Sequence, residues 1–441
     1  MPDLNRPLRI ALLSYRSKPH CGGQGIYVRH LSRELAALGH DVTVVSGPPY
    51  PELNDVPGVR LVELPSLDLY REPDPFRIPT LREFKTRIDV LEFLLMCTAA
   101  FPEPLTFSLR ARRYLAALPA DQRPDLVHDN QTLGYGLLGM QKDGFEVLAN
   151  VHHPITVDRR LDLAAAPLRK KFSMWRWYSF LRMQKRVVRR LPSILTVSQN
   201  SYDDVVRDFG VDPTVMCIVP VGVEHDVFRP PTVPRVEGRI VATASADVPL
   251  KGIVPLLEAM AKLRTERDVE LVVVGRAKQG GATQRAIERL GLQDTVRFVT
   301  GVSEAELVGV FGSAQVGVVP SLYEGFSLPA IELMACATPL VATTAGALPE
   351  VVGDAALTVP PGDSEALAQA IGRLLDDPAL AAELGEAGRR RVVERYTWHA
   401  VAEQTAAWYR RHLAGESYQA IPLPPDQTDQ TDQTEPETAT C

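Results

Sequence analysis

The chain is poor in cysteine and has no long apolar run. Its 441 residues include five scattered cysteines, at positions 21, 97, 217, 336 and 441, with no pair spaced as in a metal or redox motif. This pattern is typical of a reducing compartment, so we expect a cytoplasmic protein. No stretch approaches the roughly 18 apolar residues of a spanning helix, and the polar N-terminus is unlike a secretory signal. Attachment to the inner face of a membrane stays open.

Positive charge is not in excess either. The net charge is -6, so we expect no general attraction to nucleic acid. No pair of aspartates separated by one residue stands at a suitable strand end, and therefore we expect no metal ion. The hydrophobic content of 45% and the charged content of 23% are ordinary for a globular protein, and the length suggests two or three domains.

What the sequence does contain is a repeated alternation of strand and helix patterns. Strands are predicted at 8–14, 41–46 and 147–151, and the alternation starts again at 239. Such alternation favours two doubly wound parallel sheets, an α/β fold. We expect an N-terminal domain over 1–222, a proline-containing linker over 223–236, a C-terminal domain over 237–394, a terminal helix over 395–414 that crosses back, and a disordered tail over 415–441.

The stretch 320–353, PSLYEGFSLPAIELMACATPLVATTAGALPEVVG, carries the clearest chemistry. A predicted strand at 316–319 leads into a loop with Glu324 and Gly325, and Pro329 suits the first turn of a helix. A helix start offers free N–H groups and partial positive charge, which suit a diphosphate. Glu324 and Glu332 can accept hydrogen bonds from sugar and ribose hydroxyls.

The spacing from Glu324 to Glu332, followed by ALPEVVG, resembles the E-x7-E signature of retaining family-4 glycosyltransferases of the GT-B fold. The stretch GGQGIYVRHLSRELAALGHDVTVVS is similar to the N-terminal motif of that family. The resemblance covers most of 8–413 and implies two Rossmann-like domains facing each other across a cleft. It also implies transfer of a sugar from a UDP- or GDP-linked donor to an acceptor hydroxyl, with retention and without a cofactor.

The resemblance implies a catalytic set of His152, Glu324 and Lys251. The lysine would clamp the donor diphosphate, and His152 would bond to the sugar. The family's arginine five or six residues before that lysine is replaced here by Ser245 or Ala246. The donor would contact Gly23, Ser245, Arg276, Gly301, Val302, Gly325, Phe326, Ser327, Leu328 and Glu332.

Two other features stay open. His128 and Asp129 stand at the predicted end of a strand, where open α/β sheets place ligand groups. Residues 159–190 hold eleven Arg and Lys, one Asp and interleaved aromatics. They fit one long helix packed on the sheet with a solvated basic face, or a patch for anionic lipid or a phosphorylated acceptor. The second interpretation predicts vesicle binding by Arg182, Lys185, Arg186 and Arg189.

The reaction itself also has alternatives. A sugar-nucleotide epimerase or hydrolase would use the same fold without an acceptor. The absent arginine would fit a protein that binds a nucleotide sugar without catalysis. The sequence leaves the sugar, the base and the acceptor open.

Overall fold

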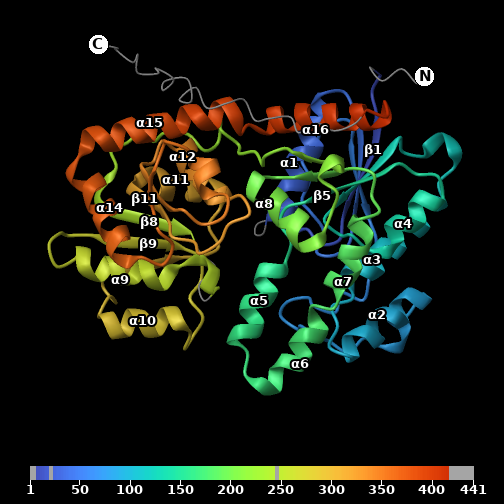
Figure 1. Cartoon of the computed structure of the whole chain (residues 1–441), viewed down its shortest axis with the longest axis horizontal. Coiled ribbons are helices and arrows are strands. Elements are labelled where there is room, and N and C mark those ends of the chain that lie inside the picture. The colour runs from blue at the N-terminus through green and yellow to red at the C-terminus, as the bar shows by residue number, and fades with distance from the viewer. Residues whose placement is uncertain (1–5, 19–22, 244–247, 417–441) are drawn as a thin grey trace, which may run out of the picture.

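The computed structural model describes residues 6–18, 23–243 and 248–416, which form two parallel sheets side by side (Figure 1). The N-terminal sheet has the order β3-β2-β1-β4-β5-β6-β7 and the C-terminal sheet the order β10-β9-β8-β11-β12-β13. Every strand pairing in both sheets is parallel. The predicted pair of doubly wound sheets is confirmed. Ser245 and the predicted tail from 417 onward lie outside the described residues.

The strands are short and apolar, because helices cover both faces of each sheet (Figure 1). Those of the N-terminal sheet are β1 (Arg9–Ser14), β2 (Asp41–Ser46), β3 (Val59–Glu63), β4 (Leu126–Asn130), β5 (Val147–Val151), β6 (Ile194–Thr196) and β7 (Met216–Ile218). Those of the C-terminal sheet are β8 (Val236–Thr243), β9 (Glu270–Val274), β10 (Val296–Val299), β11 (Ala314–Val319), β12 (Leu340–Thr343) and β13 (Leu357–Val359).

The helices follow the strands in the order that crossover connections require. The N-terminal domain has α1 (Gly23–Ala37), α2 (Arg87–Cys97), α3 (Glu103–Ala116), α4 (Tyr135–Lys142), α5 (Thr156–Ala165), α6 (Leu168–Trp177), α7 (Phe180–Val188) and α8 (Gln199–Asp204). The rest are α9 (Ile253–Leu263), α10 (Ala282–Leu290), α11 (Glu304–Ser313), α12 (Leu328–Ala335), α13 (Leu348–Val352), α14 (Ser364–Asp376), α15 (Pro378–Arg395) and α16 (Trp398–Leu413).

The single long helix expected over 159–190 is wrong. Pro167 separates α5 from α6, because the residue before a proline is held in extended backbone, as Ala166 is here. A turn at Tyr178 and Ser179 then separates α6 from α7. Only α7 packs as expected and buries most of its apolar residues, whereas α6 buries none.

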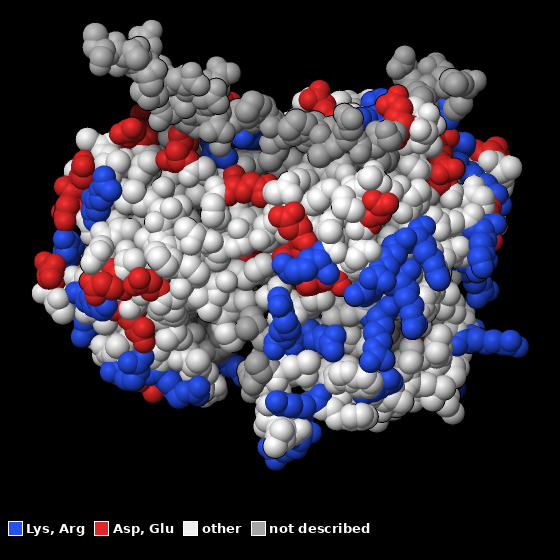
Figure 2. Space-filling view, in the orientation of Figure 1, with Lys and Arg blue, Asp and Glu red and all other residues white. Residues whose placement is uncertain are grey.

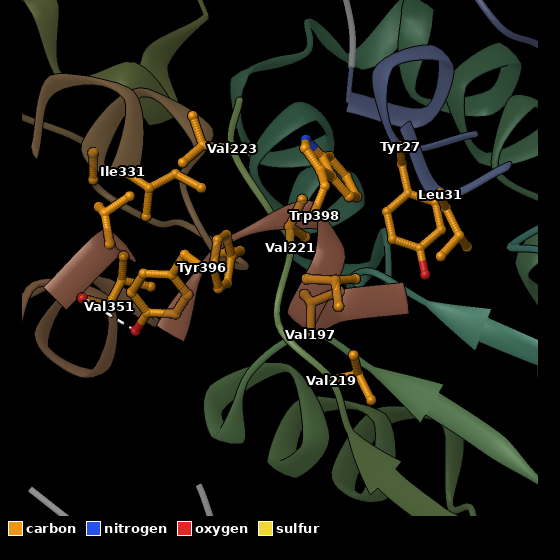
Figure 3. Close-up of a cluster of buried hydrophobic side chains, with 14 of the residues drawn as sticks. Tyr27, Leu31, Val197, Val219, Val221, Val223, Ile331, Val351, Tyr396 and Trp398 are labelled. Atoms are coloured by element: carbon orange, nitrogen blue, oxygen red, sulfur yellow. Dashed lines mark hydrogen bonds between the residues drawn. The ribbon is translucent and has the colours of Figure 1, made fainter. Parts of the chain in front are cut away.

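The two domains share one hydrophobic cluster at the hinge between them (Figure 3). Valines from the N-terminal domain and hinge, Val197, Val219 and Val221, meet Tyr396 and Trp398 from the C-terminal segment. The helix α16 then lies along the N-terminal domain (Figure 1), where the Trp408 indole donates a 2.6 Å hydrogen bond to Ser193. Apolar burial therefore fixes how the domains sit at the hinge.

Polar contacts also anchor the segment that joins the domains. The Arg389 guanidinium donates to the carbonyls of His225, Phe228 and Ala335 at 2.8–2.9 Å. Glu224 lies 2.7 Å from the His30 ring of α1 and also pairs with Arg33.

Among the described residues, no helix combines the length and the apolar content needed to cross a bilayer.

The Glu224 contacts predict an acid-sensitive hinge. Burial alone would raise the pKa of the Glu224 carboxyl, but bonds from His30 and Arg33 outweigh it and lower the pKa to about 2. The stabilisation is therefore present above the unfolded pKa near 4.5 and is lost as the pH falls toward 2. We expect Glu224→Gln to destabilise the fold by about 1–3 kcal/mol at neutral pH. The difference in melting temperature from wild type should shrink on acidification, and a constant difference would contradict this assignment.

Candidate active site

A lysine–glutamate pair lies at the carboxyl edge of the C-terminal sheet. The Lys251 ammonium is 2.7 Å from Oε1 of Glu324, and the Ser321 hydroxyl donates to the same oxygen at 2.7 Å. The two residues follow β8 and β11, which are neighbours in the sheet. A backbone bond from Leu322 to Leu250 holds their loops together at 2.7 Å. The structure thus brings together two of the three predicted catalytic residues.

The turn after β12 fixes the backbone of Glu324. Gly346 has a φ of +60°, and a Cβ atom there would lie 2.2 Å from the Glu324 carbonyl oxygen. The same carbonyl accepts a 2.9 Å bond from the Ala347 N–H. Only glycine fits this close approach. The small-residue turn of the signature stretch therefore sets where the Glu324 backbone lies.

The next residues of the signature dock on the N-terminal domain. The Gly325 carbonyl accepts hydrogen bonds from the hydroxyls of Ser198 at 2.7 Å and Ser201 at 3.0 Å. Phe326 packs its ring into the hinge cluster, 5.6 Å from the Tyr396 ring, so only its backbone can face a donor. Ser327 has a φ of +100° and is the residue just before α12. Sequence reasoning did not single out Ser198 as a site residue; it also caps the start of α8, where its side chain accepts from the Ser201 N–H.

The starts of α1 and α12 face each other across the cleft. A Cβ atom on Gly23 would lie 3.9 Å from the Leu328 side chain. Beside them is a cavity of about 140 Å³, which Leu328, Glu332 and Val302 line from one domain. Its other walls come from Ile26, Arg29, His30, Gly222, Val223, Glu224, Phe228 and Trp398, with Ser303, Glu304 and Leu307 completing it. Of the predicted donor contacts, Val302, Leu328 and Glu332 thus line one cavity, and Gly23 lies next to Leu328.

Glu332 is an unusual carboxyl in this cavity. Burial raises its pKa to about 7, with a further contribution from the negative charge of Glu304. Gly301, with a φ of +67°, is exposed at the start of the loop that carries Val302. A carboxyl that is partly protonated near neutral pH can both donate to and accept from a neutral diol, and it repels a nearby anion less than a full charge would.

His152 is held by two residues at the end of β4. Its N–H donates to Oε1 of Gln131 at 2.7 Å, and its ring Nε2 is 2.8 Å from the Asn130 side-chain oxygen. Burial lowers the pKa of His152 to about 3, with a smaller effect from His153, so the ring is neutral. When Nε2 donates to the Asn130 oxygen it carries the proton, and Nδ1 is left as an acceptor; the Asn150 amide nitrogen also lies 3.3 Å from Nε2. His153 instead points toward Asp158, 3.6 Å away.

Gln131 was missed by sequence reasoning. The side-chain nitrogen of Gln131 donates to the His153 carbonyl at 2.7 Å, and its side-chain oxygen accepts from the His152 N–H. One side chain therefore holds the backbone of both histidines. Its own backbone is left-handed, with a φ of +55°. The β4 strand runs on to Asn130, past the predicted strand end at His128 and Asp129, and Gln131 follows it directly beside the residues after β5. No local pattern in the sequence signals that contact.

His128 and Asp129 do not face the cleft as ligand groups. Both lie inside β4 and are fully buried. The His128 ring bonds to the Tyr409 hydroxyl of α16 at 2.6 Å, and Asp129 accepts the Leu133 N–H at 2.9 Å. Because the strand is longer than predicted, these side chains support the fold instead of standing at its edge.

Arg276 stands just beyond β9 and is exposed. A hydrogen bond from Lys18 lowers the pKa of the Glu72 carboxyl, and the charge of Arg276 adds to that effect. Arg276 therefore lies near the N-terminal domain, across the cleft.

Within the described residues, no group of three or more His, Cys, Asp and Glu side chains is placed to hold a metal ion.

Gly346→Ala tests the contact with the Glu324 backbone. The added methyl group would force the Glu324 loop to move, and an error of about 1 Å in such a group can lower a rate about 100-fold. Gly291→Ala is a matched control, because Gly291 has a similar φ of +65° and its nearest neighbour is the end of the Arg264 side chain at 3.5 Å. Similar rates of sugar transfer in the two variants would exclude a special role for Gly346.

Gln131→Met tests the clamp on His152. Methionine keeps the size of the side chain but loses both backbone bonds, so we expect kcat to fall by roughly 10- to 100-fold with KM for the donor nearly unchanged. Gln131→Glu keeps the acceptor for the His152 N–H and should recover part of the loss. If kcat is unchanged while only the melting temperature falls, Gln131 serves the fold alone.

Comparison with known proteins agrees with this geometry. Residues 21–227 match the family model described as Glycosyltransferase Family 4, and residues 225–391 match the model described as Glycosyl transferases group 1. The chain is 56% identical over 410 residues to an MMP alpha-(1->4)-mannosyltransferase of Mycolicibacterium hassiacum, covering 92% of this chain and 99% of the relative. It is 28% identical over 437 residues to a glycogen synthase of Mycobacterium tuberculosis, covering 95% and 98%.

Solved structures place the fold in the same group. Sucrose-phosphate synthase of Thermosynechococcus elongatus superimposes with a TM-score of 0.69 and 27% identity, covering 92% of this chain and 99% of that one. Anabaena HepE, solved in complex with UDP-glucose, gives a TM-score of 0.64 at 15% identity over 91% and 99% of the two chains, which supports the fold alone. The chain therefore belongs to the GT-B glycosyltransferases, with a family 4 N-terminal domain and a group 1 C-terminal domain.

Proposed function

We propose that this glycosyltransferase moves a mannosyl group from a nucleoside diphosphate mannose to a hydroxyl of a saccharide, with retention at the anomeric carbon and without a metal ion. The observation that carries the proposal is the Lys251–Glu324 pair in the cleft of a chain 56% identical to an alpha-(1->4)-mannosyltransferase. Nucleoside diphosphate mannoses carry an α-linked sugar. An α-linked product therefore corresponds to retention.

The reaction exchanges one C–O bond for another. As the bond from the anomeric carbon to the diphosphate breaks, the acceptor oxygen forms its bond on the same face, and its proton passes to the leaving phosphate. The sugar carries positive charge at this stage, and the diphosphate gains negative charge. The Lys251 ammonium and the N–H groups at the start of α12 are the parts of this chain suited to stabilise that anion.

Glu324 and His152 would hold the sugar between them. Glu324 can accept hydrogen bonds from sugar hydroxyls through the oxygen that does not face Lys251. The neutral His152 ring would accept from a hydroxyl through Nδ1. Its low pKa, caused mainly by burial, means that its protonation would not limit activity down to about pH 4. No protein carboxylate is assigned as a nucleophile.

Glu332 and the 301–303 loop would hold the ribose and the base. The donor is UDP- or GDP-linked in this proposal, because a loop that binds the base through backbone groups does not reveal which base it takes. The positive charge of the absent arginine would come in part from Arg276.

We also propose that the reaction takes place in the cytoplasm, where the basic segment 159–190 is suited to touch the inner face of a membrane.

A donor panel tests the reaction. We expect a labelled UDP- or GDP-mannose to transfer its sugar to a mannose-containing saccharide, with an α-linkage seen by NMR and no loss of rate in EDTA. Release of free mannose alone would indicate a hydrolase, and recovery of an isomerised nucleotide sugar would indicate an epimerase. Donor binding without turnover by any acceptor tested would support the non-catalytic alternative.

Substitution of the central pair tests the mechanism. We expect Lys251→Met to lower kcat by about 100- to 1,000-fold, because the leaving diphosphate loses its cationic partner. Glu324→Ala should abolish transfer while leaving the protein folded. Lys262→Met is a matched control, because Lys262 forms a similar pair with Glu365 on the surface of the same domain. Normal turnover in either cleft variant would refute the corresponding role.

A further inference from the structure

The helix α6 turns its apolar side chains toward solvent. Leu168, Phe172 and Trp175 follow one another at helical spacing and so share one face. Leu168 is 85% exposed and Phe172 is 73% exposed, and no residue of α6 is buried. The apolar face of an amphipathic helix normally packs against the core of its own protein. Within the described residues, Leu168 and Phe172 are left largely uncovered, and Trp175 is partly covered by Arg182 of α7.

A second exposed apolar segment lies beside α6, next to Trp177. Residues 76–81, which precede α2, expose Phe76, Ile78 at 81% and Leu81 at 91%. The Phe76 ring lies 6.2 Å from the ring of Trp177, the last residue of α6. Arg176 of α6 also bonds to Thr98 at the end of α2 at 2.8 Å. Both segments therefore lie at one end of the N-terminal domain, as Figure 1 shows for α6 and α2.

Basic side chains surround these apolar groups. Arg169, Lys170 and Lys171 are exposed on α6, and Arg82 and Lys85 are exposed beside the second segment. Figure 2 shows lysines and arginines gathered over this end of the domain, with few acidic groups among them. We call the set Phe76, Ile78, Leu81, Leu168, Phe172 and Trp175, with these five basic residues, the α6 surface.

The basic residues of α7 are engaged elsewhere. The ammonium of Lys185 and the guanidinium of Arg189 donate to the backbone carbonyls of Asp208 and Phe209, respectively. Arg186 donates to the Tyr135 hydroxyl at 3.2 Å. Of the four residues that the sequence suggested for vesicle binding, only Arg182 adjoins the apolar face, stacked 4.8 Å above the Trp175 ring. The charges of α6, and not those of α7, are therefore beside the exposed apolar groups.

We propose that the α6 surface docks the protein on a bilayer that contains anionic lipid, with α6 lying in the plane of the interface. Phe172 and Leu168 would enter the boundary between headgroups and acyl chains, and the basic residues would bind the headgroups. Attraction between the basic residues and the headgroups and burial of a few apolar side chains would both contribute. Binding is therefore reversible and sensitive to salt.

Charge and shape favour lipid over a protein partner. The segment 159–190 holds eleven basic residues and one acidic residue, while the whole chain has a net charge of -6, so positive charge is concentrated here. The hairpin of α5 and α6 projects from the domain (Figure 1). A projecting apolar ridge bordered by Arg and Lys fits a fluid anionic surface better than a shaped protein groove.

The hairpin is also connected to the candidate active site. Asp158 stands at the start of α5, next to His153. A Cβ atom on Gly325, the residue after Glu324, would lie 3.0 Å from the Cβ atom of His153. The segment that touches the bilayer therefore begins beside the catalytic pair. Docking would hold the cleft close to the membrane.

Sedimentation with vesicles tests the proposal on the full chain. We expect binding to vesicles of phosphatidylcholine mixed with phosphatidylglycerol, little binding to phosphatidylcholine alone, and loss of binding at high salt. Phe172→Ser should weaken binding at least about 10-fold, and so should the triple change of Arg169, Lys170 and Lys171 to Gln. Val393→Ser, at an exposed valine of α15 on the other domain, is the control and should bind like wild type.

Equal binding to both kinds of vesicle, or unchanged binding by Phe172→Ser, would overturn the proposal. Light scattering on the same samples without lipid tests whether a second copy of the chain covers the α6 surface instead. A dimer that Phe172→Ser abolishes would show such a copy, and that result would also overturn the proposal. Phe172→Ser should keep normal transfer to a small saccharide. Failure of docking is thus distinguishable from failure of the proposed reaction.

Discussion

The docking of one short segment of the C-terminal domain onto the N-terminal domain is the contact on which the site depends. The Gly325 carbonyl is bonded by Ser198 and Ser201, and the next residue, Phe326, is buried in the hinge cluster. Backbone hydrogen bonds and apolar burial act on adjacent residues here. As a result, the loop that carries Glu324 cannot shift without disturbing both domains.

Burial does much of the chemical tuning in this cleft. It keeps the His152 ring neutral and moves the pKa of Glu332 to about 7, although the two groups ionise with opposite signs. In both cases the cause is the same, since a buried site disfavours the charged form. The Lys251–Glu324 ion pair lies in the same cleft. A site arranged in this way suits a donor whose hydroxyls are neutral and whose diphosphate is anionic.

The N-terminal domain combines two kinds of surface in one connection between strands. Between β5 and β6 the chain passes through α5, α6 and α7, and only α7 packs tightly on the sheet. Pro167 ends α5 and allows α6 to turn outward. The same connection begins at His152 and His153, beside the cleft. A long connection can therefore carry an exposed surface without weakening the sheet, whose strands stay buried.

The sequence alone determined the two α/β sheets, strands such as Asp41–Ser46 and Val147–Val151, and the loop with Glu324, because these follow from local periodicity and from a compact signature. The tertiary structure decided which side chains surround them. Gln131 forms a hydrogen bond to the backbone after β5, and Ser198 forms one to Gly325, 127 positions away in the sequence. Such contacts join residues that no local pattern relates, since they exist only once strands have found their ends and the two domains have met at the hinge.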